Sequence, residues 1–303
     1  KTGASSDASA GNNSFVLDLT LNNSGSGYLM MGNGNPDTYT TNVNINNSGS
    51  SLIYFADNSA GNTIGGNLTI TSTGGSLGLR VSRQTGASLN VAGNLSLTAS
   101  GSADHSENIA NAGALTVGGN LDMINNCTAA NVYFYLTNGA ASTATITGTS
   151  TFINNGASTT NQRFFISDQG TTTFNGVVNI LNHSGATNSR MYFNRLATAT
   201  ANYNQNVVIE STVANCDGVS FGENTGSGIL AAGRTITIGA GGYSSGNLYL
   251  RNFTQIGATA QNLAPTGTSY MIIYDSNWGG DVTFSSPRIT TRGTTYNGVS
   301  YLE

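Results

Sequence analysis

The sequence predicts an all-β protein, a right-handed parallel β-helix, and three observations lead to this fold. The 303 residues include 40 glycines and only 8% charged residues, a composition that alone would also suit a low-complexity linker. Apolar and aromatic residues nevertheless alternate in short runs bounded by Asn, Ser and Gly, which is typical of strands and turns. The same phrase also returns every 24 to 29 residues, a period typical of stacked repeats.

Each repeat begins with an apolar anchor, and further apolar residues follow four and six positions later. Since alternate residues of a strand face the same side, each phrase supplies one coil with an apolar inner face. Weaker phrases begin at Ile146 and at Ala232. The complete phrases, in chain order, are Phe15/Leu19/Leu21, Tyr39/Val43/Ile45, Ile64/Leu68/Ile70, Val91/Leu95/Leu97, Val117/Leu121/Met123, Phe174/Val178/Ile180, Tyr203/Val207/Ile209 and Trp278/Val282/Phe284.

The period decides between the repeat architectures. Leucine-rich repeats have this length, but they need a helical part, and no 3.6-residue periodicity occurs here. We expect roughly ten to eleven coils of about 22–29 residues, with Gly and Asn at corners that need left-handed backbone. Right-handed winding follows the general preference for right-handed crossovers. Residues 1–252 are expected to form regular coils, and residues 253–303, with Pro265 and Pro287, a less regular end or junction.

Polar residues recur at two fixed places in the phrase, which predicts hydrogen-bonded ladders between coils. Asn filling turns explains part of this pattern. Eight positions after the anchor stand Asn23, Asn47, Ser72, Asn125, Asn154, Asn182 and Ser211. Three positions after the anchor, where we expect the stacking ladder, stand Asp18, Asn42, Asn67, Asn94, Asn120, Asn206 and Asp281.

Charge and aromatic residues indicate which partners to expect. With a net charge of −4 and scattered arginines, we expect no nucleic-acid partner, and the short apolar runs exclude membrane insertion by a helix. Aromatic residues recur in the second strand of each coil, and some of them must face outward. An exposed aromatic stripe could contact surface glycans or abiotic surfaces, and its candidate members are Tyr54, Tyr133, Tyr135, Tyr192 and Tyr249.

The sequence carries no recognisable catalytic or metal site, and we expect no cofactor and no enzyme activity. Cys127 and Cys216 lie about three coils apart, too far for a disulfide, and each is expected to be a small buried residue. His105 and His183 are expected at solvated corners. The acidic residues do not converge on one face, as polysaccharide-cleaving β-helices require.

Several phrases resemble modules of the giant secreted surface adhesins of gliding bacteria of the Bacteroidetes group. These are KTGASSDASAGNNSF, NNSGSGYLMMGNGNPD and SSLIYFADNSAGN, and the likeness covers residues 1–80 well and the rest in style only. More distantly, GGNLTITSTGG, AGNLSLTASGS and AGALTVGGNLD are similar to filamentous-haemagglutinin repeats. The resemblance implies an extracellular cell-surface filament used in attachment or gliding, and no catalytic residues come with it.

The two ends of the chain favour a tandem array. Joining Glu303 to Lys1 gives NGVSYLEKTGASSDASAGNNSF, which reads like the internal stretch SSLIYFADNSAGNTI. We therefore expect neighbouring copies of the same module to stack end to end. The alternative is a single-domain β-helix that binds or degrades polysaccharide. Ice binding by rows of Thr is weakened because pairs such as Thr69/Thr71 do not repeat in every coil.

Overall fold

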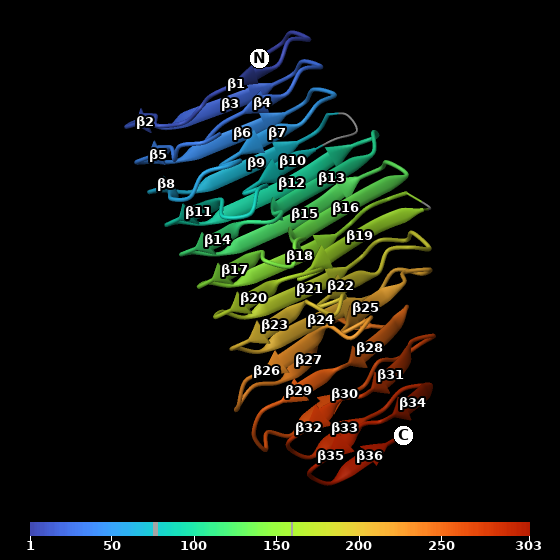
Figure 1. Ribbon diagram of the computed structural model, residues 1–303. Helices are drawn as coiled ribbons and strands as arrows, with labels where there is room; N and C mark the ends of the chain where they lie inside the picture. Colours follow the sequence, from blue (N-terminus) through green and yellow to red (C-terminus); the bar gives the residue numbers. More distant parts are fainter. Residues whose placement is uncertain (75–77, 159) are drawn as a thin grey trace.

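The computed structural model describes residues 1–74, 78–158 and 160–303. In this part of the chain every regular element is a β-strand, and the strands wind into a parallel β-helix with the two termini at opposite ends (Figure 1). The predicted fold class is confirmed. Successive coils pair in parallel along the axis, and each coil contributes one strand to each of three faces.

The first sheet has twelve strands, slightly more than the expected ten to eleven coils. These are β1 (Asp7–Ala8), β4 (Leu29–Met30), β7 (Ile53–Phe55), β10 (Leu79–Val81), β13 (His105–Ala110), β16 (Asn131–Thr137), β19 (Asn161–Ile166), β22 (Met191–Phe193), β25 (Gly218–Phe221), β28 (Asn247–Arg251), β31 (Tyr270–Tyr274) and β34 (Arg288–Arg292).

The second sheet also has twelve strands. They are β2 (Ser14–Phe15), β5 (Thr38–Tyr39), β8 (Asn62–Ile64), β11 (Ser88–Val91), β14 (Ala114–Val117), β17 (Thr143–Ile146), β20 (Thr171–Phe174), β23 (Thr200–Tyr203), β26 (Ser227–Leu230), β29 (Phe253–Gln255), β32 (Asn277–Trp278) and β35 (Thr295–Tyr296).

The third face is divided between a nine-stranded and a three-stranded sheet. The nine are β3 (Leu19–Asn23), β6 (Val43–Asn47), β9 (Leu68–Ser72), β12 (Leu95–Gly101), β15 (Leu121–Cys127), β18 (Ser150–Asn154), β21 (Val178–Asn182), β24 (Val207–Ser211) and β27 (Ile236–Tyr243). The three are β30 (Gln261–Leu263), β33 (Val282–Phe284) and β36 (Ser300–Leu302).

The anchors stack in register along the second sheet, but the prediction of Ala232 as an anchor was wrong. From Phe15 to Tyr203 the paired residues are those of the repeat phrase, but Tyr203 pairs with Leu230 and not with Ala232. Leu230 is fully buried, whereas Ala232 is exposed on the turn that follows. The larger apolar side chain fills the core, and a longer turn between β26 and β27 shifts the phrase.

Rows of identical or similar side chains fill the interior. Phe134 stacks on Phe164 with ring centroids 4.6 Å apart, and Phe174 stacks on Tyr203 at 5.6 Å. Trp278, the only tryptophan, is fully buried near the C-terminal end. Parallel stacking therefore places each coil's core residue on its counterpart in the next coil, where aromatic pairs add to the stability gained from apolar burial.

A left-handed residue follows most strands of the first sheet and turns the chain toward the second. Asn194, Asn252 and Asp275 occupy this corner with φ of 47°, 48° and 52°. Gly222 occupies it with φ of 70°, and a Cβ there would lie 1.7 Å from the carbonyl oxygen of Arg251. Asn, Asp and Gly tolerate this conformation best, which explains why the corners are rich in them.

The polar row eight positions after the anchor lies inside the solenoid, where the third-sheet strands end. Asn125 Nδ2 donates to Asn154 Oδ1 at 2.9 Å, and Asn154 Nδ2 donates to Asn182 Oδ1 at 3.3 Å. Asn182 Nδ2 also donates to the carbonyl oxygens of Ser189 and Gly218 at 2.7 and 2.8 Å. These buried amides satisfy main-chain groups at a corner that has no strand partner.

Candidate functional site

The outer face of the first sheet gathers almost all the positive charge of the chain. Eight of the nine arginines lie in strands of this sheet or within two residues of them. The ninth, Arg234, lies between β26 and β27. The arginines are therefore scattered in the sequence but gathered in space, because residues one coil apart become neighbours. The eight are Arg80, Arg83, Arg163, Arg190, Arg195, Arg251, Arg288 and Arg292.

Aromatic rings occupy the same outer face and stack along it. Tyr135 pairs in register with Phe165, which pairs with Tyr192. Their ring centroids are 4.9 and 5.2 Å apart, and the rings are nearly parallel. The stacking follows from parallel register, since every coil places its outward residue directly over the one before.

Guanidinium groups lie over these rings at cation–π distance. The strand pattern explains the pairing, because an arginine two residues from an aromatic residue shares its face, as in Arg190-x-Tyr192 and Tyr249-x-Arg251. The distances from Cζ to the ring centroid are 4.7 Å for Arg83–Tyr54, 4.8 Å for Arg195–Phe165, 4.3 Å for Arg190–Tyr249, 4.7 Å for Arg251–Tyr249 and 4.5 Å for Arg292–Tyr274.

Several of the arginines are ion-paired across coils. The fully buried carboxylate of Asp57 accepts from Arg83 Nε at 2.7 Å and Nη2 at 2.9 Å. This hydrogen bond raises the pKa of Arg83. Asp168 and Arg195 form the same two-pronged pair further along the face. Each pair locks a corner of one coil to the corner of the next.

Arg190 is held in the same way, between two acidic residues. It lies 2.7 Å from Asp217 and 3.5 Å from Glu223. Burial lowers the pKa of Arg190, but the charge and hydrogen bond of Asp217 outweigh burial, so the pKa is raised. Arg190 therefore stabilises the outer face through its ion pairs and has no free charge for a ligand.

Other arginines of the face are free of carboxylates. Within the described residues, Arg163, Arg251 and Arg288 have no acidic group within ion-pair distance, and the Nε atoms of Arg163 and Arg251 are buried without a hydrogen-bond partner. Arg80 donates to the Ser106 carbonyl oxygen, and burial lowers its pKa. Two of these arginines, Arg251 and Arg288, lie in the C-terminal coils.

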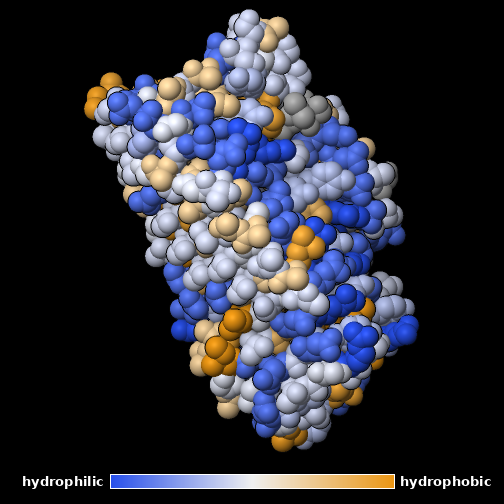
Figure 2. Space-filling model, viewed as in Figure 1, coloured by the Kyte–Doolittle hydropathy of each residue, from blue (hydrophilic) through white to orange (hydrophobic). Residues whose placement is uncertain are grey.

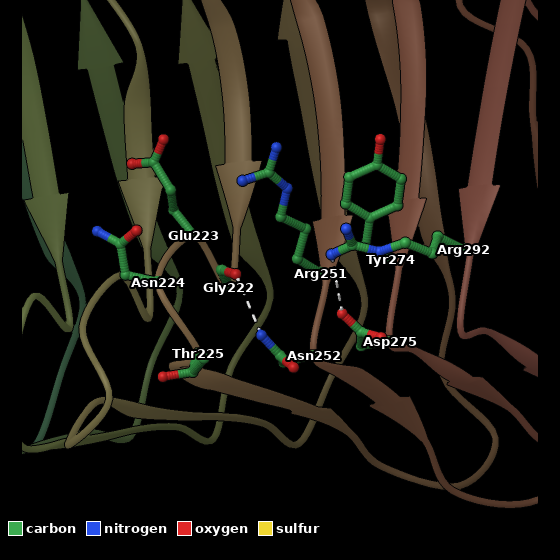
Figure 3. A pocket seen from close by; sticks show the side chains of 9 residues that line it. All are labelled: Gly222, Glu223, Asn224, Thr225, Arg251, Asn252, Tyr274, Asp275 and Arg292. Carbon is green, nitrogen blue, oxygen red and sulfur yellow. Dashed lines mark hydrogen bonds and ion pairs between the residues drawn. The ribbon is translucent and has the colours of Figure 1, made fainter.

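Two shallow pockets lie side by side at this end of the face and share Tyr274. The first has a volume of about 230 Å³ and lies between the ends of β25, β28, β31 and β34, with Glu223, Arg251, Tyr274 and Arg292 in its wall (Figure 3). In Figure 3 the side chains of Glu223, Arg251 and Tyr274 project from three neighbouring segments in the same direction.

The second pocket has a volume of about 220 Å³ and an aromatic wall. Tyr270, Ile272 and Tyr274 are the outward residues of β31, and Arg288 and Thr290 stand beside them on β34. Tyr270 is more open than Ile272 and Tyr274, with 42% of its full accessible surface exposed. The pocket therefore combines open aromatic surface with one unpaired cation.

All five tyrosines predicted as surface contacts lie on this outer face, but to different depths. Tyr54, Tyr133 and Tyr135 are half-buried. Tyr192 and Tyr249 are only 7% and 9% exposed, because neighbouring rings and Arg190 cover them. The arginines and the more exposed Tyr270 were not predicted from the sequence, although arginine and aromatic residues alternate in it at the spacing of one strand face.

The predicted stacking ladder lies on another edge, between the second and third sheets. Its side chains do not bond mainly to one another. The Oδ1 atom of Asn67 accepts from the main-chain N–H of Asn94 at 2.8 Å, and Asn94 Oδ1 accepts from that of Asn120 at 2.8 Å. Asn42, Asp18, Asn206 and Asp281 accept from the next coil in the same way.

The structure corrects the placement of His105. It is 1% exposed and lies inside the solenoid on β13, and not at a solvated corner, because the alternation of this strand turns it inward with Glu107. His105 Nδ1 and Glu107 Oε1 are 3.4 Å apart. Within the described residues these groups have no hydrogen-bond partner.

The remaining candidate groups form no site. His183 is partly exposed beside Glu210, with 3.3 Å between Nε2 and Oε2. Cys127 and Cys216 are both buried and unpaired. Burial raises the pKa of Cys127 to about 12. Residues 1–74, 78–158 and 160–303 contain no cluster of three His, Cys, Asp or Glu side chains that could hold a metal ion.

Two further findings bear on classification. Known protein families, curated proteins and solved structures contain no match to this chain. Within the described residues no helix is long and apolar enough to cross a membrane.

Proposed function

We propose that this chain is a structural and adhesive module of a long extracellular surface filament, one unit of a tandem array used in attachment or gliding. The observation that carries the proposal is that both ends of the solenoid present open strand edges with exposed apolar side chains. Phe15, Leu19 and Leu21 face the core in the first coil but are only partly buried, and Leu302 in the last coil is 40% exposed. Such edges readily pair with a further coil.

The two ends are also in phase with each other. The last coil ends with β36 on the third face, and the first coil begins with β1 on the first sheet, so a second copy would continue the same order of faces. Phe15 stacks on Tyr39 at 5.0 Å, and Tyr296 holds the equivalent position in the last coil. A stacked neighbour would therefore place Tyr296 against Phe15 and cover both.

Stacked modules would form a stiff stalk with a hydrophilic surface. Hydrogen bonds and core contacts run along the axis from coil to coil, and only 8% of the residues are charged. On the face seen in Figure 2, apolar groups lie only in small clusters. Many weak contacts along such a stalk would add up through avidity. This supports a role in attachment at the cell surface.

The size of the native polypeptide tests the array. Surface material would be separated on a denaturing gel and probed with an antibody to this module. We expect a species many times larger than 31 kDa, because the modules are covalently joined. A discrete band near 31 kDa would contradict the array.

The second candidate function is a single-domain β-helix that binds or degrades polysaccharide. The pocketed arginine–aromatic face favours binding over cleavage. The two carboxylates of the first pocket, Glu223 and Asp275, lie 3.5 and 3.6 Å from Arg190 and Arg292, an arrangement that holds charge and does not suit proton transfer. A glycan-cleavage assay that released reducing ends would overturn our view that the module is not an enzyme.

A further inference from the structure

We propose that the C-terminal part of the first sheet's outer face binds an acidic polysaccharide, through Tyr270 and Tyr274 and the guanidinium groups of Arg251 and Arg288. This inference deepens the adhesive part of the proposed function, on which it rests, by naming the ligand class. It does not depend on whether modules are joined into an array. Four lines of evidence on this face lead to it.

The shape of the face fits an extended polymer. The two pockets of about 230 and 220 Å³ are adjacent, shallow and joined at Tyr274. They lie across successive strands from β25 to β34, which are spaced by roughly 4.8 Å. The strands pair without interruption in this part of the sheet, so the two pockets form one extended surface. A chain-like ligand can use such a surface better than a compact one.

The lining of the second pocket fits a sugar. Tyr270 and Tyr274 stand on the same side of β31, with Ile272 between them, and Thr290 provides a hydroxyl beside Ile272. Binding sites of small ligands combine aromatic and apolar walls with a few placed polar groups. Here the 42% exposure of Tyr270 leaves ring surface open to the C–H face of a sugar ring.

The unpaired arginines make the preferred sugar an acidic one. Arg251 and Arg288 have no ion pair within the described residues, and the Arg251 Nε atom is buried without a hydrogen-bond partner. Arg292 lies 3.6 Å from Asp275, and both side chains are mostly exposed, so this pair is weak and open to exchange. A guanidinium fork matches a carboxylate or sulfate group in two parallel hydrogen bonds.

The distribution of charge favours a glycan over a nucleic acid. Three arginines of the N-terminal and central coils are already paired with Asp57, Asp168 and Asp217, and the whole chain carries a net charge of −4. Of the arginines without an ion pair in the described structure, only Arg251 and Arg288 line the two pockets. Phosphate backbones instead require a continuous basic stripe.

Binding to purified polymers tests the proposal. The module would be titrated with polygalacturonate as the carboxylated probe, dextran sulfate as the sulfated probe, and dextran as the neutral probe. We expect polygalacturonate or dextran sulfate to bind with an affinity that falls as salt rises, and dextran to bind at least tenfold more weakly. The comparison of the two acidic probes identifies which anionic group is recognised.

Substitutions locate the site. Arg251→Gln with Arg288→Gln should weaken acidic-glycan binding at least tenfold, and Tyr270→Ala should weaken it through the lost ring surface. Arg234→Gln is the matched control, because Arg234 lies away from this face and has no ion pair in the described structure. Circular dichroism and thermal unfolding would show that each variant keeps its fold.

Three results would overturn the proposal. They are no binding of either acidic polymer, equal binding of the double variant and the Arg234→Gln control, or tighter binding of oligo-dT than of polygalacturonate. None of these results depends on the gel experiment. A large surface species that fails to bind glycan would retain the filament and remove this ligand, and a 31-kDa species that binds would do the reverse.

Discussion

At the scale of single residues, the outer asparagine ladder explains a glycine that precedes it. A Cβ at Gly93 would lie 2.4 Å from Asn67 Oδ1, and one at Gly119 would lie 2.3 Å from Asn94 Oδ1. The two residues of each Gly-Asn pair therefore act together in stacking one coil on the next. Asn reaches the main-chain N–H of the next coil, and Gly leaves room for the Asn of the coil before it.

This arrangement predicts that substitutions of Gly119 and Asn94 change the free energy of unfolding non-additively. Gly119→Ala should lower the free energy of unfolding by about 1–3 kcal/mol, since nearby atoms must shift. Asn94→Ala alone should cost about 0.5–1.5 kcal/mol through the lost hydrogen bond. The double variant should lose less than the sum of the two, because the oxygen that opposes the new Cβ is gone. Urea unfolding measures the stability of the two single variants and the double variant, and Thr116→Ala at an exposed position is the control. Strictly additive losses would contradict the interaction between Gly119 and Asn94.

The buried His105–Glu107 pair predicts an asymmetry between single and double substitutions. His105→Leu should destabilise the protein by about 3–5 kcal/mol, because the buried Glu107 carboxyl loses the imidazole that lies 3.4 Å away. His105→Leu with Glu107→Met should recover much of this loss, since an apolar pair of similar size needs no compensation. Thermal and urea unfolding check the comparison. A double variant less stable than the single one would show that the pair itself stabilises the coil.

Buried phenols predict that stability falls at alkaline pH. Burial raises the pKa of Tyr203 well above its ordinary value of 10.0. Above pH 10 the unfolded chain releases this proton while the folded chain keeps it, so stability present below pH 10 is lost as pH rises. Tyr203→Phe should reduce the alkaline loss in urea unfolding compared between about pH 8 and pH 11.

The stability of Tyr203→Phe at neutral pH provides a second test. The Tyr203 hydroxyl is buried without a hydrogen-bond partner in the described structure, so its removal should not destabilise the protein and should add about 1 kcal/mol. Tyr274→Phe, on the outer face, is the matched control. A Tyr203→Phe variant with the same alkaline loss as the parent would show that other groups govern it.

At the scale of elements, β24 and β27 form the one pair of third-sheet strands with a register shift, among those that the structure describes. Ile209 pairs with Ile238, but Ser211 pairs with Tyr243, so β27 has extra residues between them. Glu210 fills the resulting bend. Its Oε1 accepts from the Gly241 N–H at 2.9 Å, and a Cβ at Gly239 would lie 2.3 Å from that oxygen. The bend lies just before the third face divides.

Glu210 should therefore hold this bend closed. Glu210→Ala removes a charge-assisted hydrogen bond to Gly241, and we expect the peptide that spans residues 236–243 to exchange amide hydrogens about tenfold faster. Hydrogen exchange with mass spectrometry measures this. Peptides from β18 serve as the internal control, and equal acceleration there would mean general destabilisation.

At the scale of the whole molecule, the strands of each coil pair only with strands of the neighbouring coils, so stability is close to a sum of coil-to-coil terms. The end coils have one neighbour and exposed apolar side chains, whereas central coils such as those of β15 to β20 have two. We expect amide exchange to be slowest in β15 to β20 and fastest in β1, β2, β35 and β36. Uniform exchange over all coils would indicate one all-or-none unit.

Stacking changes this expectation in a measurable way. If modules join end to end, peptides from β36 and β1 should become protected in a polypeptide of two joined copies, but only at the joint. The outer ends of that pair should stay as fast as before. The two copies of each peptide have the same sequence, so each peptide should show one slow and one fast isotope population, and the single module is the control.

The sequence by itself determined the architecture of this protein. Anchors such as Phe15, Tyr39 and Ile64 repeat at a period that allows only a stack of coils, and the alternation around them fixes which side chains face inward. The positions of the ladder residues could also be predicted from the sequence. Their side-chain oxygens, however, accept from main-chain N–H groups of the next coil. Periodicity carries this information because each coil repeats the same local rule.

The tertiary structure alone decided what meets across coils. Arg83 and Asp57 are 26 residues apart in sequence yet form a partly buried ion pair, and eight scattered arginines become one face. His105 turned inward with Glu107 because strand register, and not composition, sets its direction. Neighbours across coils depend on the length of every intervening turn, and a shift of one residue would place each side chain on the other face.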